Sequence, residues 1–257
     1  MNNNLRNFEK NTKQYQLYKK MYINQDLNFV KKKLAQYSNF KKKWTMSQVF
    51  EMLDTFIDVS DPDVNMPNSF HAIQTAERCR REQPSNFDLQ ITCLIHDFGK
   101  ILFKFKEQQF CIVGDTYIVG YPFPKSIVFY NLLKNNKNFK KYTKTKNIYK
   151  SKCGLDNVLI SFGHDEYLYR VLKFNKENHK LSNKYLNIIR FHSLYPWHSG
   201  NAYKELMTEK DKDTLKNVLE FNNYDLYSKS DELIITHEIK EYYNNLLKLY
   251  FPKPLFW

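Results

Sequence analysis

The dipeptide His96-Asp97 places two strong metal ligands side by side in the run His96-Asp97-Phe98-Gly99-Lys100, directly after an apolar segment. If this segment is helical, neighbouring side chains point about 100° apart, so the pair cannot hold one ion as an i, i+4 pair would. The arrangement makes sense if the Asp97 carboxylate bridges two ions while the His96 imidazole binds only one. A single His-Asp pair is common, so its meaning depends on the other candidate ligands.

Further candidate ligands lie far apart in the sequence, each on its own expected helix or helix end: His71, His164, His192 and Asp225. Taken singly, each has an ordinary structural explanation, such as a hydrogen-bonded core histidine or an acid that favours a helix terminus. Together they need a different explanation. Asp97 and His192 follow apolar runs and are therefore expected to be buried, and a buried charged or polar group requires a partner. Imidazoles and carboxylates without thiolates suit iron, manganese or zinc in a site with open positions.

The composition favours one helical domain. Of the 257 residues, 42% are hydrophobic and 16% aromatic, and only 6 Gly and 8 Pro are present, which disfavours loop-rich or β-rich folds. No repeat and no Ser/Gly linker divides the chain. The four cysteines lack a CxxC spacing, the first residues lack an apolar targeting segment, and no apolar run approaches the roughly 20 residues of a membrane span. We therefore expect a reduced, cytoplasmic protein without membrane contact.

The net charge of +13 raises the question of a nucleic-acid partner. The basic residues are diffuse and accompanied by many Asn, Ile, Tyr and Phe, a mixture that resembles a coding bias toward AT-rich codons. The runs Lys31–Lys33 and Lys41–Lys43 lack the aromatic interleaving of a single-strand binding platform. We expect no nucleic-acid partner, and without an interface-like apolar stripe we expect a monomer.

Hydrophobic patterns predict helices over most of the chain, beginning with amphipathic segments at about 13–36 and 46–57. Asn68-Ser69 has the character of an N-cap for a helix that carries His71 and ends near Glu82. Further helices are expected at about 156–174, 182–193, 212–222 and 236–249. These helices would bring the candidate ligands from separate parts of the chain to one place.

The sequence pattern in the middle of the chain predicts a central helix followed by a short β-hairpin. Ser85 and Asp88 have the spacing of a capping box, and the helix that they begin is apolar on most sides through Leu102. The β-leaning pieces 110–113 and 117–119 are interrupted by glycines, and 135–152 has the composition of an exposed loop. The expected fold class is all-α, a mainly helical bundle with one small β-hairpin in a single domain.

Six longer motifs resemble the myo-inositol oxygenase family in their order along the chain: Asp61–His71, His96–Lys100, Val113–Thr116, Ser161–Tyr169, Arg190–Ser193 with Tyr195–His198, and Phe221–Tyr227. The resemblance covers nearly the whole chain, up to Trp257. It implies an HD-domain-like catalytic domain over 41–257 and an N-terminal extension over 1–40 that contributes to a substrate lid, the two forming one structural unit.

The resemblance also implies a non-haem, mixed-valence centre of two iron ions, Fe2+ and Fe3+. The first iron would be bound by His71, His96, Asp97 and Asp225. The second would be bound by the bridging Asp97 together with His164 and His192, and a water or hydroxide would form a further bridge. The reaction that it implies is cleavage of the C1–C6 bond of myo-inositol to D-glucuronate, with O2 as co-substrate.

The family's substrate contacts have counterparts at Arg6, Asp58, Val59, Ser60, Lys100, Gly114, Asp115, His192 and Ser193. Val59 stands where the family usually has an acidic residue. The stretch before His71 is shorter than is usual in the family, so the alignment of Arg6 with the family's contact residue is the least direct of these. Asp97 and Lys100 would be the catalytic residues. Lys100 is expected one helical turn after His96 on the same face, with its ammonium group directed toward the metals.

Two other functions remain open. Many HD-domain proteins are metal-dependent phosphohydrolases, and that activity would account for the basic charge and for Lys100. It does not predict the contexts of Gly114-Asp115 and His192-Ser193. The second alternative, a helical nucleic-acid-binding protein without catalysis, leaves the buried His and Asp residues unexplained.

Overall fold

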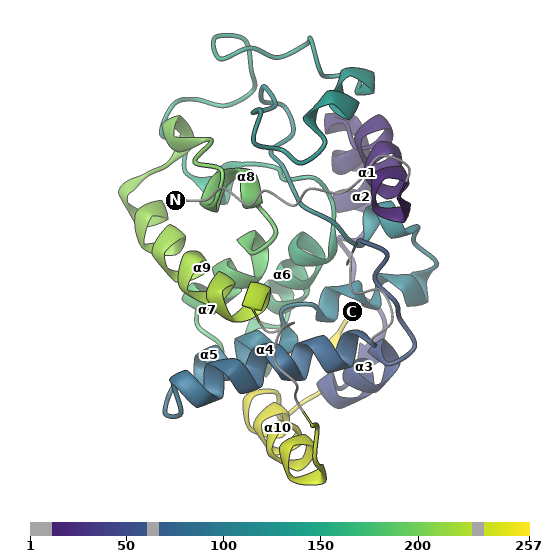
Figure 1. Ribbon diagram of the computed structural model, residues 1–257, viewed down its shortest axis with the longest axis vertical. Coiled ribbons are helices and arrows are strands. Elements are labelled where there is room, and N and C mark those ends of the chain that lie inside the picture. The colour runs from purple at the N-terminus through teal and green to yellow at the C-terminus, as the bar shows by residue number, and fades with distance from the viewer. Residues whose placement is uncertain (1–11, 61–66, 228–233) are drawn as a thin grey trace.

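The computed structural model describes residues 12–60, 67–227 and 234–257, and it confirms the mainly helical, single-domain prediction (Figure 1). The α-helices are α1 (Lys13–Asn24), α2 (Leu27–Gln36), α3 (Met46–Leu53), α4 (Asn68–Glu82), α5 (Phe87–Ile95), α6 (His164–Phe174), α7 (Asn183–Phe191), α8 (Tyr195–His198), α9 (Glu209–Tyr227) and α10 (His237–Tyr250). The 3-10 helices are η1 (Phe98–Phe105), η2 (Gln109–Cys111), η3 (Tyr130–Asn135), η4 (Leu155–Asn157), η5 (Lys176–Asn178) and η6 (Lys204–Leu206).

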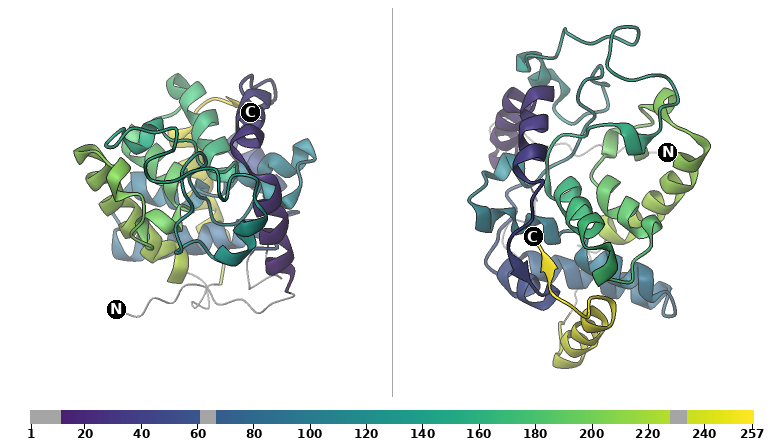
Figure 2. Two further views of the ribbon diagram at one scale, coloured as in Figure 1. Left: turned by 90° about the horizontal axis from the view of Figure 1, so that it is seen from above. Right: turned by 180° about the vertical axis from the view of Figure 1, so that it is seen from behind.

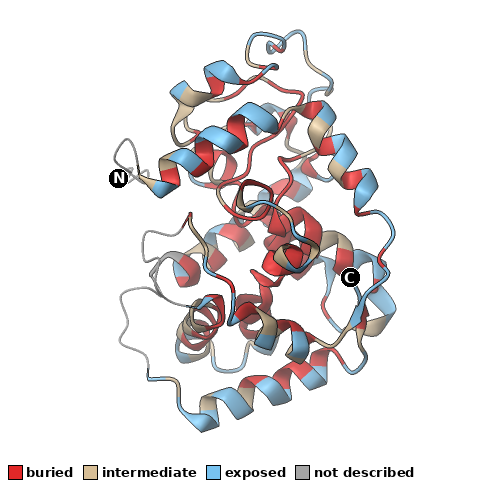
Figure 3. Ribbon diagram, turned by 90° about the vertical axis from the view of Figure 1, so that its right-hand side faces the viewer, coloured by how far each residue is buried: buried red, intermediate tan, exposed pale blue. Residues whose placement is uncertain are grey.

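The core is formed where helices from both halves of the sequence pack together. α4 packs along α5, α6 packs against α7 and η1, and α9 contacts α4, α5 and α7. Segments at the centre of the molecule are buried along most of their length, whereas outer helices are buried on one side only (Figure 3). None of the helices in the described residues combines the length and the apolar character needed to span a bilayer.

The predicted hairpin within 110–128 is wrong. Among the described residues, the two-stranded antiparallel sheet joins β1 (Lys43–Trp44) to β2 (Leu255–Phe256), so it connects distant parts of the chain (Figure 2). Residues 109–111 form η2, and 117–119 pair with 159–161 through an isolated bridge and main-chain hydrogen bonds. The β-leaning side chains there reflect burial in the core, which sequence periodicity does not distinguish from strand pairing.

The central helix is shorter than predicted. α5 ends at Ile95, Asp97 adopts φ −94° and ψ 0°, and the chain continues as the tighter helix η1. In a 3-10 helix, residues three apart share a face. The side chain of Lys100 therefore lies against Asp97, and not one α-helical turn above His96 as the sequence predicted.

Both predicted N-caps are wrong. α5 is capped by Asn86, whose side chain accepts a hydrogen bond from the main-chain N–H of Leu89. α4 begins after Pro67 without a side-chain cap. The amide oxygen of Asn68 instead accepts a hydrogen bond from Lys100 Nζ at 3.0 Å. The ammonium group of Lys100 is buried, and a buried charged group requires such a partner.

The first predicted amphipathic segment is two helices, α1 and α2, because Gln25 is fully buried between them. Its amide nitrogen donates to the carbonyl oxygens of Phe110 and Phe162, both at 2.8 Å, and its amide oxygen accepts from the N–H of Phe162. Asp26 then caps α2. These bonds fasten the N-terminal helices to the segment that leads into α6.

The partly buried carboxylate of Glu107 anchors α2, and it predicts a pH dependence of stability. Burial raises the pKa of Glu107, but hydrogen bonds from Lys33 and Tyr37 outweigh burial and lower it. The ionised form therefore stabilises the fold above the carboxyl group's ordinary pKa, and this contribution disappears as the pH falls below it. Glu107→Gln should reduce the free energy of unfolding by up to about 1 kcal/mol at pH 7. In urea titrations the difference in unfolding free energy between the variant and wild type should vanish in acid. An equal difference at pH 7 and in acid would contradict the role of the ionised carboxylate.

Candidate metal centre

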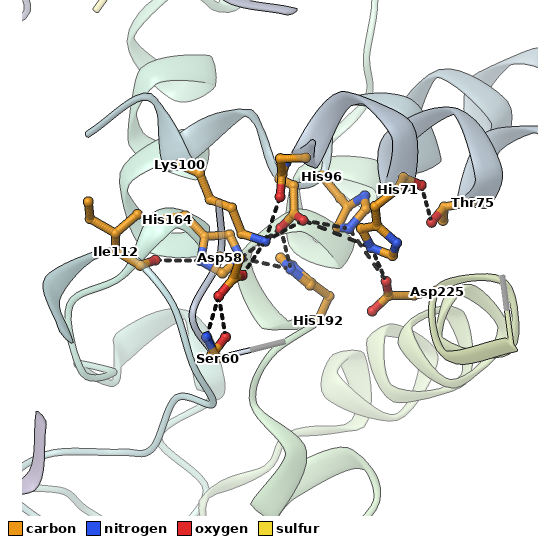
Figure 4. Close-up of polar contacts among 12 residues, drawn as sticks. Asp58, Ser60, His71, Thr75, His96, Lys100, Ile112, His164, His192 and Asp225 are labelled. Atoms are coloured by element: carbon orange, nitrogen blue, oxygen red, sulfur yellow. Dashed lines mark hydrogen bonds and ion pairs between the residues drawn. The ribbon is translucent and has the colours of Figure 1, made fainter. Parts of the chain in front are cut away.

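Five elements bring the six predicted metal ligands together around one cavity (Figure 4). His71 comes from the first turn of α4, His96 and Asp97 follow α5, His164 begins α6, His192 follows α7, and Asp225 lies near the end of α9. The same cavity is lined by the predicted substrate contacts Asp58, Ser60, Lys100, Gly114, Asp115 and Ser193 and by Tyr195. Tyr195 was not among the predicted site residues.

The Asp97 carboxylate directs one oxygen to each of two groups of ligands. Its Oδ1 lies 3.1 Å from His164 Nε2 and 3.8 Å from His192 Nε2. We call Asp97, His164 and His192 the second cluster. A carboxylate with its two oxygens facing two sets of donors has the arrangement of a bridging ligand.

The other oxygen, Asp97 Oδ2, lies 3.5 Å from His96 Nε2 and 3.9 Å from His71 Nε2. Asp225 completes this side, with its Oδ1 2.9 Å from His71 Nε2 and 3.5 Å from His96 Nε2. We call His71, His96, Asp97 and Asp225 the first cluster. In each cluster, the Asp97 oxygen and the two imidazole nitrogens lie within 4.8 Å of one another.

Main-chain carbonyl groups fix the tautomers of three of the four imidazoles. The Nδ1 atoms of His96, His164 and His192 lie 2.7, 2.7 and 2.8 Å from carbonyl oxygens of residues 93, 112 and 189. Because a carbonyl oxygen only accepts, each Nδ1 donates and each Nε2 keeps a lone pair for a metal. The exception is His71, whose Nδ1 has no hydrogen-bond partner among the described residues.

The second cluster requires positive charge at its centre. The Nε2 atoms of His164 and His192 are 3.1 Å apart, too close for two lone pairs unless a proton or a metal ion lies between them. Burial lowers the pKa of His192, but the nearby negative charges of Asp97 and Asp165 outweigh burial and raise it to about 9. A metal cation satisfies the same demand, so the donor set fits a metal.

The carboxylates of both clusters are held in the ionised form that binds metals. Burial raises the pKa of Asp97, but the positive charge of Lys100 and the neighbouring histidines outweigh it and hold the pKa well below its usual range. The hydrogen bond from His71 similarly lowers the pKa of Asp225 against the effect of burial. Burial lowers the pKa of His96 to about 4, so this imidazole is neutral at physiological pH.

Lys100 is a buried cation that connects a predicted metal ligand, Asp97, to a predicted substrate contact, Asp58. Its Nζ lies 2.6 Å from Asp97 Oδ2 and 2.7 Å from Asp58 Oδ2. Although burial lowers the pKa of Lys100, the two carboxylates raise it well above its usual value, so the group is charged. Ser60 in turn donates from its N–H and its hydroxyl to Asp58 Oδ1, at 2.7 and 2.6 Å.

Of the remaining predicted substrate contacts among the described residues, some line the cavity and one does not. Asp115 Oδ1 accepts a hydrogen bond from the hydroxyl of Tyr18 in α1 at 2.9 Å, so the N-terminal helices support this wall of the cavity. Val59 lies outside the cavity and lines a separate groove beside α1. Arg6 is outside the described residues. Asn68 was missed because its position at a helix start favoured a capping role.

Gly99 is required by the close approach of η1 to α6, which predicts a strong effect of Gly99→Ala. A Cβ at this position would lie 2.7 Å from the carbonyl carbon and 3.0 Å from the Cα of His164. Backbone atoms cannot move aside cheaply, so the variant should lose about 1–3 kcal/mol of stability. It should also displace His164 and weaken metal retention. Chemical denaturation and metal analysis check both effects, and a variant with wild-type stability would contradict the packing argument.

The sequence is similar to known proteins over nearly its whole length. A sequence profile described as "Myo-inositol oxygenase" matches residues 11–257. The inositol oxygenase of Danio rerio is 46% identical over 264 residues, covering 98% of this chain and 92% of the relative. That of Mus musculus is 43% identical over 244 residues, covering 93% and 85%. The probable inositol oxygenase of Oryza sativa subsp. japonica is 41% identical over 265 residues, covering 99% and 85%.

Proposed function

This chain belongs to the myo-inositol oxygenase family, and from that premise we propose that it cleaves the C1–C6 bond of myo-inositol with O2 to form D-glucuronate at a non-haem di-iron centre. The observation that carries the proposal is the Asp97 carboxylate, whose Oδ1 faces the second cluster and whose Oδ2 faces the first. Nitrogen and oxygen donors without thiolates are typical of such iron sites.

In this proposal each cluster would hold one iron, Asp97 would be a ligand of both, and a water or hydroxide would form a further bridge. The neutral imidazole of His96 and the ionised carboxylate of Asp97 support it, because metal ligands must be deprotonated. When bound, the irons would lower the pKa of an inositol hydroxyl and exchange electrons with O2, with a Fe2+/Fe3+ pair as the working state. The substrate supplies all four electrons, as the balance C6H12O6 + O2 → C6H10O7 + H2O requires.

The substrate would be held by hydrogen bonds, because a polyol carries no charge to grip. Asp58 and Asp115 present carboxylate oxygens to the cavity, and Ser60 and Ser193 add hydroxyl groups. Gly114 has φ +96°, which glycine adopts readily, and without a side chain its backbone can approach a ligand closely. Loss of any such bond leaves a buried polar group unpaired, which is how a site of this kind discriminates between isomers.

Lys100 and His192 would act where the substrate meets the metals. The ammonium group of Lys100 touches both Asp97 and Asp58, so it can stabilise negative charge that develops on an inositol oxygen. His192 also lines the cavity and would contact substrate from the second cluster. Asp97 and Lys100 are therefore the proposed catalytic residues.

The N-terminal extension, residues 1–40, would contribute to closure over the substrate. Its support is the bond from Tyr18 to Asp115, which joins α1 to the cavity wall. Arg6 and Val59 remain proposed substrate contacts of this extension and of the adjoining loop. A cavity closed in this way would exclude water during turnover.

The main alternative, a phosphohydrolase of the HD type, is disfavoured by the sequence comparisons, because the matching family and the relatives are inositol oxygenases. We also propose a cytoplasmic monomer with no nucleic-acid or membrane partner. Sedimentation of the purified protein would reveal a dimer if that expectation were wrong.

Reconstitution with ferrous iron under limited oxygen separates the alternatives. Addition of myo-inositol should start oxygen uptake and uronic acid formation, whereas nucleoside phosphates should release no phosphate. Inositol-independent phosphate release would favour the hydrolase. A chain that binds two irons and consumes no oxygen with inositol would refute the oxygenase proposal.

A further inference from the structure

A buried ion pair joins the two helix ends that carry the histidines of the second cluster. Arg190 Nε lies 2.7 Å from Glu166 Oε2, and the two side chains are only 5% and 2% exposed. Glu166 lies in the first turn of α6, two residues after His164. Arg190 lies in the last turn of α7, two residues before His192. The pair is therefore a direct side-chain link between the ligand-bearing ends of two helices.

Other contacts hold both members of this pair in place. Arg190 Nη2 donates to the carbonyl oxygen of Val158 at 3.1 Å, and Nη1 lies 3.4 Å from the carbonyl oxygens of Leu155 and Asp156. The other oxygen of Glu166, Oε1, accepts a hydrogen bond from Arg170 Nε at 2.7 Å. The Arg190 guanidinium group thus fastens α7 both to α6 and to η4, near the segment that leads into His164.

The position of this pair is informative because metal affinity depends on how ligands are spaced. His164 and His192 come from different helices, yet their Nε2 atoms lie 3.1 Å apart. Each imidazole is oriented by a main-chain carbonyl group, but those bonds set ring orientation and not the distance between the helices. The Glu166–Arg190 pair acts on that distance, since it joins the helices within one turn of each ligand.

We propose that Glu166 and Arg190 are positioning residues that set the separation of His164 and His192, and so determine how tightly the second cluster holds its metal. This inference rests on the proposed two-metal function. The two clusters differ in this respect. In the first cluster, α4 and α9 are joined by the neutral side chain of Gln83, which donates to Glu220 and Tyr224, each at 2.7 Å. Weakening the ion pair should therefore affect one metal and leave the other unchanged.

Release of iron from the loaded protein to an excess of a colorimetric ferrous chelator, without oxygen, tests the proposal. In Arg190→Gln and Glu166→Gln, one of the two irons should leave about 10- to 100-fold faster than in wild type, the usual effect of losing a group that orients a ligand. The other iron should keep its wild-type rate. Arg190→Lys should show a smaller acceleration, because lysine keeps the charge but lacks the planar fork.

A control is Arg80, which is itself 38% exposed and forms an ion pair with the buried Glu77 at 2.6 Å within α4, so this ion pair links no two helices. Arg80→Gln should leave both release rates unchanged. Equal acceleration of both irons, or wild-type rates in Glu166→Gln and Arg190→Lys, would overturn the positioning role even if Arg190→Gln failed to fold. A wild-type chain with fewer than two irons would instead contradict the di-iron assignment.

Discussion

Asp97→Ala is expected to lose both irons, because it removes the one carboxylate that faces both clusters. Its oxygens lie 3.1 Å from His164 Nε2 and 3.5 Å from His96 Nε2, so each cluster loses a negatively charged ligand. Removal of one member of a buried charged group is strongly unfavourable, since its partners are left unpaired. Iron analysis after desalting should therefore give close to zero irons per chain in the variant and two irons per chain in wild type.

The matched variant Asp97→Asn keeps the shape of the side chain and removes its charge. It should also fail to retain the iron pair, which separates the loss of charge from the formation of a cavity. Unfolding of both variants in the presence of a chelator checks that the chain still folds. Full occupancy of two irons in Asp97→Ala would contradict the bridging role.

Lys100→Met is expected to retain iron and to lose most of its inositol turnover. Among the described residues that line the cavity, Lys100 is the only lysine or arginine. It is not a metal ligand, so both clusters keep their donors. The methionine side chain fills similar space but cannot stabilise developing negative charge, and loss of one such group typically lowers kcat by about 10²- to 10³-fold.

A matched control for this variant is Lys33→Met, which removes the Lys33–Glu107 ion pair at 2.6 Å, away from the cavity. It should leave turnover unchanged. Steady-state oxygen uptake at saturating myo-inositol, with iron content measured in the same samples, makes the comparison. Wild-type turnover in Lys100→Met would remove Lys100 from the proposed mechanism.

The helical fold and the set of ligand candidates could be predicted from the sequence because each has a local signal. Amphipathic periodicity marks helices, and polar residues such as Asp97 and His192 are conspicuous after apolar runs. The predicted ligands come together in the structure, although their spacing in the sequence does not require them to form one site. The prediction of one site depended on the long motifs and their fixed order.

Features that depend on contacts between distant segments could not be predicted. Just after α5 ends, Gly99 approaches the backbone of His164, which lies 65 residues later in the chain (164 − 99). The position of Glu166 at a helix start fits a solvated acid and a group that orients an imidazole equally well, and no local pattern identifies Arg190 as its buried partner. Such partners are visible only once the helices are assembled.

The central claim is that this cavity performs an oxygen-dependent cleavage of myo-inositol, and labelling with 18O2 tests it most directly. The iron-loaded protein is given myo-inositol and 18O2, and the product is analysed by mass spectrometry together with the oxygen consumed. The account predicts D-glucuronate carrying one 18O atom, formed in equal amount to the O2 consumed. Oxygen consumption without uronic acid, or unlabelled product, would contradict it.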